Sequence, residues 1–438
     1  MKILYVSDNR CRENYGCRAT STALSQLIGS SHEIVGHISG MYTYMPGDLV
    51  FNKGWSRDKY TKFSKRKYFA YWAKLYCLFH RGVSKIKHRK FLLGEYDFVS
   101  YDLDLSIENL IKCLPANPHI SEYDLRQYDF DAMVVNGEGS FIFAKKPWRE
   151  SMILLMLMHW AQKLGKKVYF MNAMLSDDPN SEHNDRTVEL ANQIFSKCEI
   201  VQVREDVSFA YTKKHFPELE NVYLKPDALF TWYPLVNDDF EVKDGKYFMP
   251  FGRESDEFYY AFDFSKPYIL IAGSSSSRLH SDLNDTIKSY EALTNHIKNS
   301  FPSYNVYLII TCGGDDFFYE VGRKTKTNVI PAEMPIVAAS KILANASLFV
   351  TGRYHPAILA SLGGTPCVFM GSNSHKTYSL QVLLEYKNPV EFDCLPNDGE
   401  IARIINASKL AITQDRIKIQ DRAFTLSKDA QGILDLIK

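Results

Sequence analysis

Short runs of β-branched residues alternate with longer amphipathic stretches along this chain of 438 residues. The alternation is typical of parallel strands joined by helices. Strands are expected in the first half at 2–7, 33–38, 132–136, 167–172, 200–203 and 222–224, and in the second half at 268–272, 306–311, 328–330, 348–351 and 366–370. Each half therefore predicts one doubly wound unit.

The expected fold class is α/β, with two doubly wound Rossmann-like domains that face a cleft. The first domain is expected at 1–235, with a basic aromatic insertion at about 55–92, and the second at 262–425. A C-terminal helix at 426–438 is expected to pack back on the first domain. A linker is placed at 232–267, which carries three prolines and little helical periodicity. Ligands of such sheets bind beyond the carboxyl ends of the strands, so the loops that follow the strands are the candidate site.

Composition excludes several classes of protein. The 52 basic and 51 acidic side chains nearly cancel, which gives no reason to expect a nucleic-acid partner. No signal peptide is expected, and the most apolar stretch, 152–160, is too short to span a bilayer. The eight cysteines form no CxxC pair, so reduced thiols, no metal and a cytoplasmic location are expected.

One insertion departs from the neutral balance. Residues 57–90 contain 12 Lys or Arg and one acid, Asp58, interleaved with aromatic side chains. A solvated helical insertion with its aromatics toward the core is one interpretation. A second is peripheral contact with an anionic inner-membrane surface or a lipid-linked acceptor, and a third is contact with nucleic acid.

Polar residues follow two strands of the first half. Asn136-Gly137-Glu138-Gly139-Ser140 predicts a turn in which two glycines let the backbone approach a ligand and the carboxylate stands at the strand tip. Arg204 ends another strand and is suited to hold a carboxylate or phosphate, or else to pair with Glu205 or Asp227; Asp206 or Ser208 would cap the next helix.

Two further loops belong to the second half. Gly273, Ser274 and Ser275 form a polar turn whose hydroxyls and amides suit phosphate oxygens. In the segment Gly352-Arg353-Tyr354-His355-Pro356, the proline is expected at the first position of a helix, so that Arg353 and His355 converge at its amino terminus. A guanidinium beside an imidazole suits an anionic substrate that also needs proton transfer. Lys376, on the next loop, could reach the same anion.

Taken together, the GEG segment, VREDVS at 203–208, KPDALF at 225–230 and GRYHPAILASLGGTPCVF at 352–369 followed by a lysine resemble the polysaccharide pyruvyl transferase family. The resemblance covers roughly residues 130–380, with a weaker match at Asn14-Tyr-Gly-Cys-Arg18. It implies a GT-B-like architecture and transfer of the pyruvyl group of phosphoenolpyruvate onto two sugar hydroxyls as a ketal. It also implies that Arg353 and His355 hold and protonate phosphoenolpyruvate, and that Arg204 and Lys376 contact its carboxylate or phosphate.

The chain is thus expected to be a transferase of capsule or O-antigen synthesis that needs no cofactor and acts on a glycan or lipid-linked oligosaccharide acceptor. An alternative is a GT-B glycosyltransferase with a nucleotide-activated donor, such as a CMP-activated 3-deoxy ulosonic acid (Kdo or sialic acid). A second is a non-catalytic glycan- or partner-binding protein. The expected catalytic residues are His355, Glu138 and Asp227, and the expected substrate-binding residues are Arg353, Arg204, Lys376, Asn136, Gly137, Gly139, Ser140, Gly273, Ser274, Ser275 and Tyr354.

Overall fold

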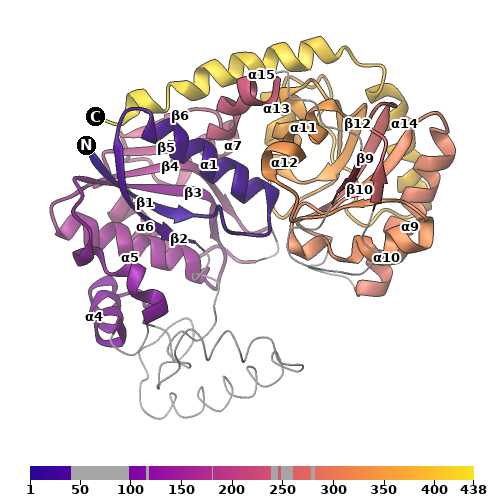
Figure 1. Ribbon diagram of the computed structural model, residues 1–438. Helices are drawn as coiled ribbons and strands as arrows, with labels where there is room; N and C mark the ends of the chain where they lie inside the picture. The colour runs from indigo at the N-terminus through magenta and orange to yellow at the C-terminus, as the bar shows by residue number, and fades with distance from the viewer. Residues whose placement is uncertain (41–97, 115–117, 180, 238–244, 248–259, 278–281) are drawn as a thin grey trace.

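A computed structural model describes residues 1–40, 98–114, 118–179, 181–237, 245–247, 260–277 and 282–438. Two parallel sheets lie side by side, each flanked by helices (Figure 1). The expected α/β class with two Rossmann-like units is confirmed. The basic insertion at about 55–92 lies outside the described residues.

The first sheet has six strands in the order β2-β1-β3-β4-β5-β6, all parallel. Its elements in chain order are β1 (Lys2–Asp8), α1 (Tyr15–Gly29), β2 (Glu33–Ser39), α4 (Leu103–Cys113), β3 (Ala132–Phe143), α5 (Arg149–Lys163), β4 (Lys167–Asp177), α6 (Asp185–Phe195), β5 (Ile200–Val203), α7 (Asp206–His215) and β6 (Val222–Leu224). Two short 3-10 helices, η3 (Pro118–Tyr123) and η4 (Leu125–Gln127), precede β3.

The second sheet has five parallel strands in the order β11-β10-β9-β12-β13. Its elements are β9 (Tyr268–Ser274), α9 (Leu283–Ser300), β10 (Asn305–Ile309), η7 (Gly313–Asp315), α10 (Phe317–Thr325), β11 (Val329–Ile330), α11 (Ile336–Asn345), β12 (Leu348–Gly352), α12 (Tyr354–Leu362), β13 (Cys367–Phe369), α13 (Lys376–Leu383) and α14 (Asp398–Ala411).

Regular structure also occurs where an irregular linker was expected. η5 (Ala228–Trp232) and α8 (Tyr233–Asn237) follow the first sheet, and β7 (Gly245–Tyr247) pairs antiparallel with β8 (Tyr260–Phe262). The boundaries expected for the two domains stay a prediction.

The chain ends in α15 (Arg416–Gln431) and η8 (Leu434–Leu436). α15 crosses over both halves of the molecule in Figure 1 and contacts η5 and α12. The carbonyl oxygen of Lys438 accepts hydrogen bonds from Tyr169 Oη at 2.6 Å and Lys167 Nζ at 3.0 Å, both on β4. The helix thus begins ten residues earlier than the position expected for it, and the last residue contacts the first sheet.

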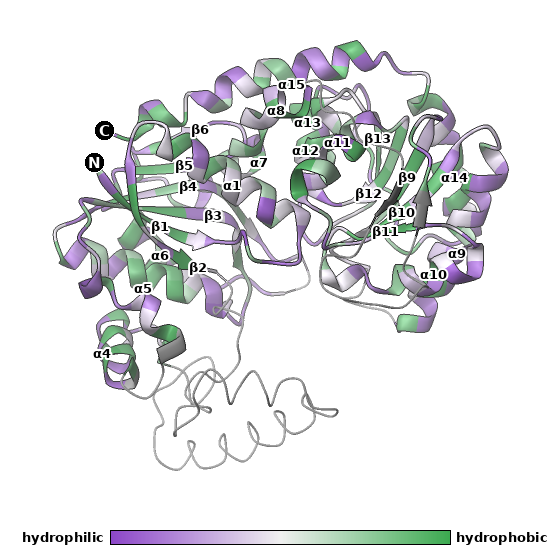
Figure 2. Ribbon diagram, in the orientation of Figure 1, coloured by the Kyte–Doolittle hydropathy of each residue, from purple (hydrophilic) through white to green (hydrophobic). Residues whose placement is uncertain are grey.

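Alternate residues of each central strand enter different cores, because both faces of a parallel sheet are covered. In β1, Leu4 and Val6 pack with α5 in one cluster, whereas Ile3 and Tyr5 belong to a second cluster that also includes residues of β9, α12 and α15. Figure 2 accordingly shows hydrophobic residues along the strands of both sheets. The second cluster joins the two sheets in one continuous core.

The start of α1 docks directly on the second half of the chain. Tyr15 donates from its backbone to the carbonyl of Thr311 at 2.8 Å and from its hydroxyl to the carbonyl of Pro331. Arg18 donates to the carbonyls of Ala332 and Met334 at 3.0 and 2.6 Å. These bonds fix the face on which the site described below is built. None of the helices that the structure describes is long and apolar enough to cross a membrane.

Candidate functional site

The backbone is strained along one line of the first sheet. Ser7, Glu138 and Asn172 have φ values of 64°, 38° and 56°, and they lie on the neighbouring strands β1, β3 and β4. Positive φ costs a non-glycine residue about 1–3 kcal/mol and clusters at functional sites. All three side chains are buried and point polar groups into one network, so this line marks the floor of the candidate site.

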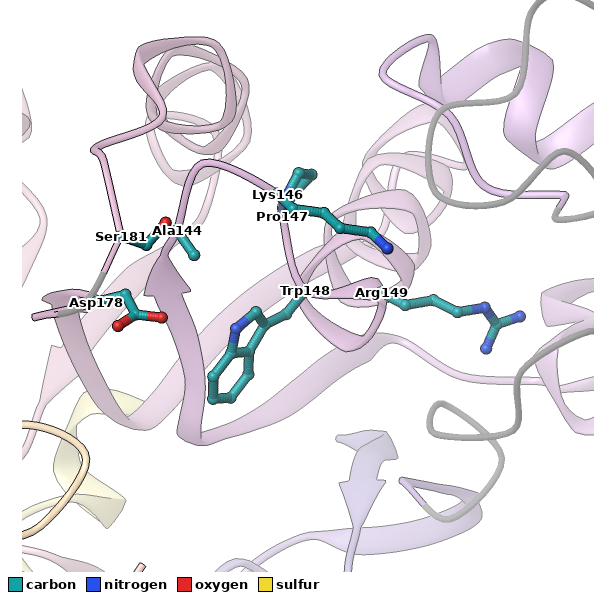
Figure 3. A pocket seen from close by; sticks show the side chains of 7 residues that line it. All are labelled: Ala144, Lys146, Pro147, Trp148, Arg149, Asp178 and Ser181. Carbon is teal, nitrogen blue, oxygen red and sulfur yellow. The ribbon is translucent and has the colours of Figure 1, made fainter. Parts of the chain in front are cut away.

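A surface cavity of about 450 Å³ lies farther along the same strands (Figure 3). It is lined by the turn between β3 and α5 and by the loop that follows β4. Trp148, which precedes α5, is among its lining residues.

Glu138 was expected at a strand tip. It lies instead inside β3, which continues to Phe143. Its Oε1 accepts from Asn9 Nδ2 at 2.8 Å, Asn136 Nδ2 at 2.9 Å and Ser21 Oγ at 3.1 Å. Three neutral donors therefore hold the carboxylate in place. The predicted loop at 136–140 is wrong, because these residues belong to β3 and Gly137 serves packing: a Cβ at Gly137 would lie 2.6 Å from the Cβ of Ala173 on β4.

Asp227 is fully buried just after β6 and caps η5 through the amide of Leu229. Its Oδ1 accepts from Thr20 Oγ1 at 2.8 Å, and its Oδ2 lies 2.9 Å from Arg204 Nη1. Burial opposes its ionisation, but His355 and Arg204 outweigh burial and hold the pKa of Asp227 well below its ordinary value. The carboxylate is thus a permanent anion, and the ion pair of Arg204 with Asp227 is one of the two alternatives that the sequence left open for Arg204.

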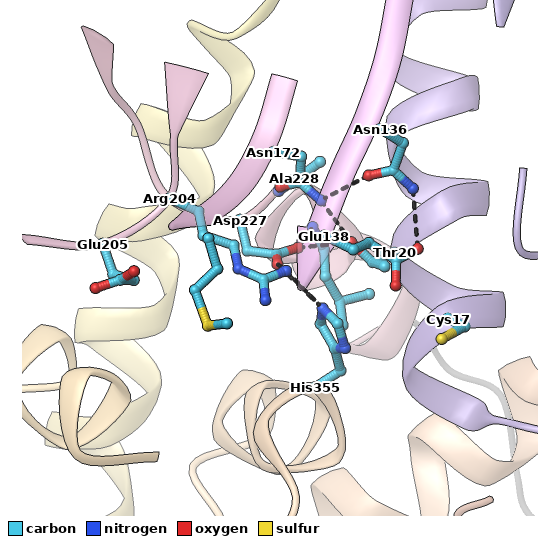
Figure 4. Close-up of polar contacts among 12 residues, drawn as sticks. Cys17, Thr20, Asn136, Glu138, Asn172, Arg204, Glu205, Asp227, Ala228 and His355 are labelled. Carbon is cyan, nitrogen blue, oxygen red and sulfur yellow. Dashed lines mark hydrogen bonds and ion pairs between the residues drawn. The ribbon is translucent and has the colours of Figure 1, made fainter. Parts of the chain in front are cut away.

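His355 reaches into this cluster from α12 of the second half (Figure 4). Its Nε2 lies 3.2 Å from Asp227 Oδ2 and 3.0 Å from Arg204 Nη1. Because Nε2 cannot accept from arginine while it donates to aspartate, the two contacts correspond to Nε2 without and with its hydrogen. The Tyr354 ring stacks on the Arg204 guanidinium at 4.6 Å and meets the imidazole edge-on.

Arg353 and His355 diverge, contrary to expectation. Helix α12 begins at Tyr354, so that Pro356 is its third residue and Arg353 is its N-cap. Arg353 Nη2 pairs with the buried Asp315 Oδ1 at 2.5 Å, within the second half, and Gly273 lies against the same carboxylate. Within the described residues, Arg353 Nε, Arg204 Nε and the Tyr354 hydroxyl are buried without a hydrogen-bond partner.

Lys376 is the first residue of α13, where the helix dipole disfavours a cation and favours an anion. Its Nζ donates to Asn373 Oδ1 at 2.6 Å, and the same oxygen accepts from Ser275 Oγ at 3.0 Å. Burial, followed by the charges of Arg353 and Arg204, lowers the pKa of Lys376 to about 7. The loops that carry Ser275 and Lys376 therefore lie together. An anionic ligand bound there would stabilise the protonated form of Lys376.

A second contact between the halves lies beside Lys376. His375 Nε2 is 3.0 Å from Glu205 Oε1, and Glu205 caps α7 through the amide of Ser208 at 3.0 Å. Asp206 or Ser208 was expected to cap α7, and this prediction is wrong. The helix begins at Asp206 itself, one residue earlier than a cap at that position requires. Burial opposes ionisation of Glu205, but His375 outweighs it and lowers its pKa.

Some expected residues lie apart from this cluster. Ser140 donates to Glu150 Oε1 at 3.1 Å at the start of α5, and Ser274 donates to the carbonyl of Gly371. Gly139 has open space beside it, with only Met174 at 3.8 Å. Asn136, by contrast, belongs to the buried network, where it donates to Glu138.

The sequence did not single out Thr20, Asn172, Asp315 or His375 as site residues. The amide of Asn172 donates to Gln202 Oε1 at 2.6 Å and its side chain donates to Thr20 at 2.9 Å, so that Asn172 and Thr20 together support Asp227. A short polar side chain at the end of a predicted strand was the signal available for Asn172. Three or more His, Cys, Asp or Glu side chains arranged to hold a metal ion do not occur in the part of the chain that the structure describes.

Two doubly wound sheets that share a packed face, with polar residues at the carboxyl ends of the strands, define a GT-B-like protein. The S. aureus MnaA–UDP co-structure has this fold, with a TM-score of 0.53 and 12% identity over 100% of this chain and 98% of that chain. The UDP-GlcNAc 2-epimerase of Methanocaldococcus jannaschii has a TM-score of 0.50 and 11% identity over 100% and 99%. At such identities the likeness establishes the fold alone. The chain spans 58% of the length of a mutant of S. aureus TarM, at a TM-score of 0.43 and 11% identity over 75% of this chain.

The family follows from the sequence match. The polysaccharide pyruvyl transferase model matches residues 40–374, which is most of the chain. The protein therefore belongs to the polysaccharide pyruvyl transferase family and is a transferase. No curated protein matches it.

Proposed function

We propose that this protein transfers the pyruvyl group of phosphoenolpyruvate onto two hydroxyls of a sugar in a cell-surface glycan, forming a cyclic ketal and releasing phosphate. The observation that carries the proposal is the position of His355 Nε2, 3.2 Å from Asp227 and 3.0 Å from Arg204. A histidine nitrogen with one partner for its bare form and one for its N–H form is suited to deliver and recover a proton. The family match supports the same chemistry.

The reaction begins with protonation of the methylene carbon of phosphoenolpyruvate, which becomes the methyl group of the product. Protonated His355 supplies this proton, and its neutral form then accepts a hydrogen bond from Arg204. Asp227, buried and already bound by Thr20 and Leu229, orients the imidazole and is not itself a base.

Cations then stabilise the anionic groups of the donor. Lys376 would bind the carboxylate or phosphate and gain a proton on binding, because an anion raises its lowered pKa. The unpartnered Nε of Arg353 and the amino termini of α12 and α13 would add donors for the leaving phosphate. The donor needs no cofactor in this scheme.

Addition of the first sugar hydroxyl to the cationic C2, loss of phosphate and closure by the second hydroxyl complete the ketal. Glu138 is proposed to accept the proton of one hydroxyl, since its carboxylate is fixed by three donors at the floor of the site, and neutral His355 recovers the proton of the other. We propose further that the acceptor is an oligosaccharide, either free or lipid-linked. The enzyme is proposed to act at the inner membrane surface.

A second candidate function is sugar transfer from a nucleotide donor, for example a CMP-activated 2-keto sugar acid. The GT-B-like fold favours it, and the cations that suit pyruvate suit such donors equally. In a glycosyltransferase that uses Glu138 as base, Glu138→Gln abolishes turnover, whereas a pyruvyltransferase driven by His355 retains part of it. Full activity of the Gln variant in both assays removes Glu138 from catalysis.

The test of the proposed function is thermal unfolding with and without candidate donors, followed by phosphate release. Phosphoenolpyruvate at 100 times its dissociation constant stabilises the folded state by about 2.7 kcal/mol. We expect a raised melting temperature with phosphoenolpyruvate and acceptor-dependent release of phosphate. Stabilisation by CMP or UDP but not by phosphoenolpyruvate contradicts the proposal and favours the glycosyltransferase, and no response to any donor favours a glycan-binding protein.

A further inference from the structure

The cavity beside Trp148 is separate from the cluster around His355. It is lined by Trp148, Lys146, Arg149, Asp178 and Ser181, together with Ala144 and Pro147, and is called the Trp148 pocket below. Its volume of about 450 Å³ falls in the range of small-molecule sites. Figure 3 shows the indole projecting from the turn before α5, with Asp178 and Ser181 on one side of it and Lys146 and Arg149 on the other.

The walls of the Trp148 pocket are tied together. The amide of Lys145 donates to Ser181 Oγ at 3.0 Å, its Nζ pairs with Glu182 at 2.6 Å, and its carbonyl accepts from Asn184 Nδ2 at 2.7 Å. On the other side, the guanidinium of Arg149 lies 5.3 Å from the ring of the buried Phe98. The pocket is thus formed before any ligand arrives, which lowers the entropic cost of binding.

The lining has the chemistry of a site for an acidic sugar. The half-buried indole of Trp148 offers an apolar face for the C–H face of a pyranose and a donor at its edge. Asp178 and Ser181 present acceptor oxygens to sugar hydroxyls, while the hydrogen of Ser181 Oγ is directed to the carbonyl of Glu182. Lys146, which is exposed, and Arg149 supply positive charge for a carboxylate or phosphate on the ligand.

The distance along β3 indicates which unit of the acceptor glycan the Trp148 pocket would bind. Glu138 and Ala144 are six residues apart, which corresponds to roughly 15–20 Å along an extended strand. That separation is longer than one sugar ring. A sugar in the Trp148 pocket is therefore not the one that reacts near His355 but a unit farther along the same acceptor.

We propose that the Trp148 pocket binds a remote, acidic sugar residue of an oligosaccharide acceptor, so that the enzyme selects extended anionic glycans over monosaccharides. The inference rests on the proposed function only in that the bound glycan is the acceptor. Binding of the glycan itself needs no donor and no turnover.

The experiment measures binding to the full chain by calorimetry, without phosphoenolpyruvate, for a panel of glucuronate-containing tetrasaccharides, their carboxyl-reduced forms and the free monosaccharides. We expect the acidic tetrasaccharides to bind and Trp148→Ala to weaken them at least tenfold, with Trp148→Phe retaining most of the affinity. Lys146→Ala should weaken only the acidic forms. Tyr223→Ala, which removes an exposed aromatic ring on β6, is the matched control and should change nothing.

Equal affinity of wild type and Trp148→Ala, or no binding of any tetrasaccharide to wild type, overturns the inference. So does competition for the Trp148-dependent site by CMP or UMP, which would make the pocket a nucleoside site. If glycan binding depends on Trp148 but phosphoenolpyruvate is never consumed, the proposed function fails and the pocket stands. If turnover occurs with the same KM for tetrasaccharides in wild type and Trp148→Ala, the pocket fails and the proposed function stands.

Discussion

His355 on α12 and Asp227 after β6 meet across the boundary between the two sheets, with Nε2 and Oδ2 3.2 Å apart. The two residues are 128 positions apart in the sequence and belong to different halves of the fold. The histidine is therefore oriented only when the halves are packed together, which couples assembly of the shared core to completion of the site.

Asp227→Asn is expected to lower kcat by roughly 10²- to 10⁴-fold, because the imidazole loses the anion that stabilises its protonated form. It should also destabilise the fold by about 3–5 kcal/mol, since the buried Arg204 loses its counter-ion. Because the pKa of Asp227 is depressed, this stability difference is present above about pH 4 and is lost only as pH falls through the lower, folded-state pKa.

The control for this change is His355→Gln, which keeps the ion pair of Arg204 with Asp227. It should lose as much activity but much less stability, as measured by phosphate release and urea unfolding. Equal unfolding free energies of the two variants would show that the Asp227 carboxylate does not balance the charge of Arg204.

Gly16→Ala tests the packing of α1 against His355. A Cβ at Gly16 would lie 2.6 Å from His355 Nδ1, so the ring must shift from the position in which it contacts Asp227. We expect kcat/KM to fall at least tenfold. Gly29→Ala, in the same helix, places its Cβ 3.9 Å from Ile34 and should keep full activity, with stability unchanged or higher by up to about 1 kcal/mol. Wild-type activity in Gly16→Ala would mean that His355 acts from another position.

The pH dependence of donor binding should report Lys376. Below about pH 7 this residue is protonated and binds the anionic donor, so kcat/KM for phosphoenolpyruvate should fall as pH rises through 7. Lys376→Met should be about 10- to 100-fold lower than wild type at pH 6, as expected for a lost charged hydrogen bond, and similar to wild type at pH 9. A wild-type profile that rises through pH 7, or an unchanged profile in the variant, argues against a role for Lys376.

The same substitution has a consequence for stability. In the unfolded chain Lys376 keeps its proton up to about pH 10.4, whereas the folded chain releases it near pH 7. Unfolding takes up a proton between these values, so the folded protein gains stability as pH rises across this window. Lys376→Met should therefore stabilise the ligand-free protein at pH 6 by on the order of 2 kcal/mol, because one pKa unit corresponds to about 1.4 kcal/mol and part of the site is open to solvent. The difference should disappear near pH 10.

The sequence predicts best those structural features that depend on residues adjacent in the chain. The runs at 200–203 and 222–224 are apolar or β-branched between polar turns, and they form β5 and β6 with the expected bounds. The glycines around Glu138 predicted a turn, although Gly137 is required by contact with Ala173 on β4, a partner that only the sheet order reveals. Arg353 was expected beside His355 because the two are adjacent, but its direction is set by Asp315, 38 residues away. Side-chain direction at this site depends on such distant partners, which local pattern does not contain.

Glu205 and His375 form the second contact between the halves, and their charge should position Lys376 without touching the reacting atoms. Glu205→Gln retains an oxygen for the amide of Ser208 and removes the anion beside His375. We expect the KM for phosphoenolpyruvate to rise about three- to tenfold with kcat within twofold of wild type, because the loop that carries Lys376 loses its anchor. The kcat/KM profile should also shift, since the pKa of Lys376 depends on how deeply the loop is buried.

The matched control is Asp104→Asn, which removes the carboxylate that lies 2.9 Å from His159 within the first half, where the aspartate side chain is 57% exposed. This variant should leave KM, kcat and the pH profile unchanged. A purely structural role of Glu205 would lower the melting temperature and leave the pH profile at its wild-type midpoint. A kcat that falls as far as in His355→Gln would instead place Glu205 in the chemistry, because loss of an anchor changes donor affinity and not the rate of the bound complex.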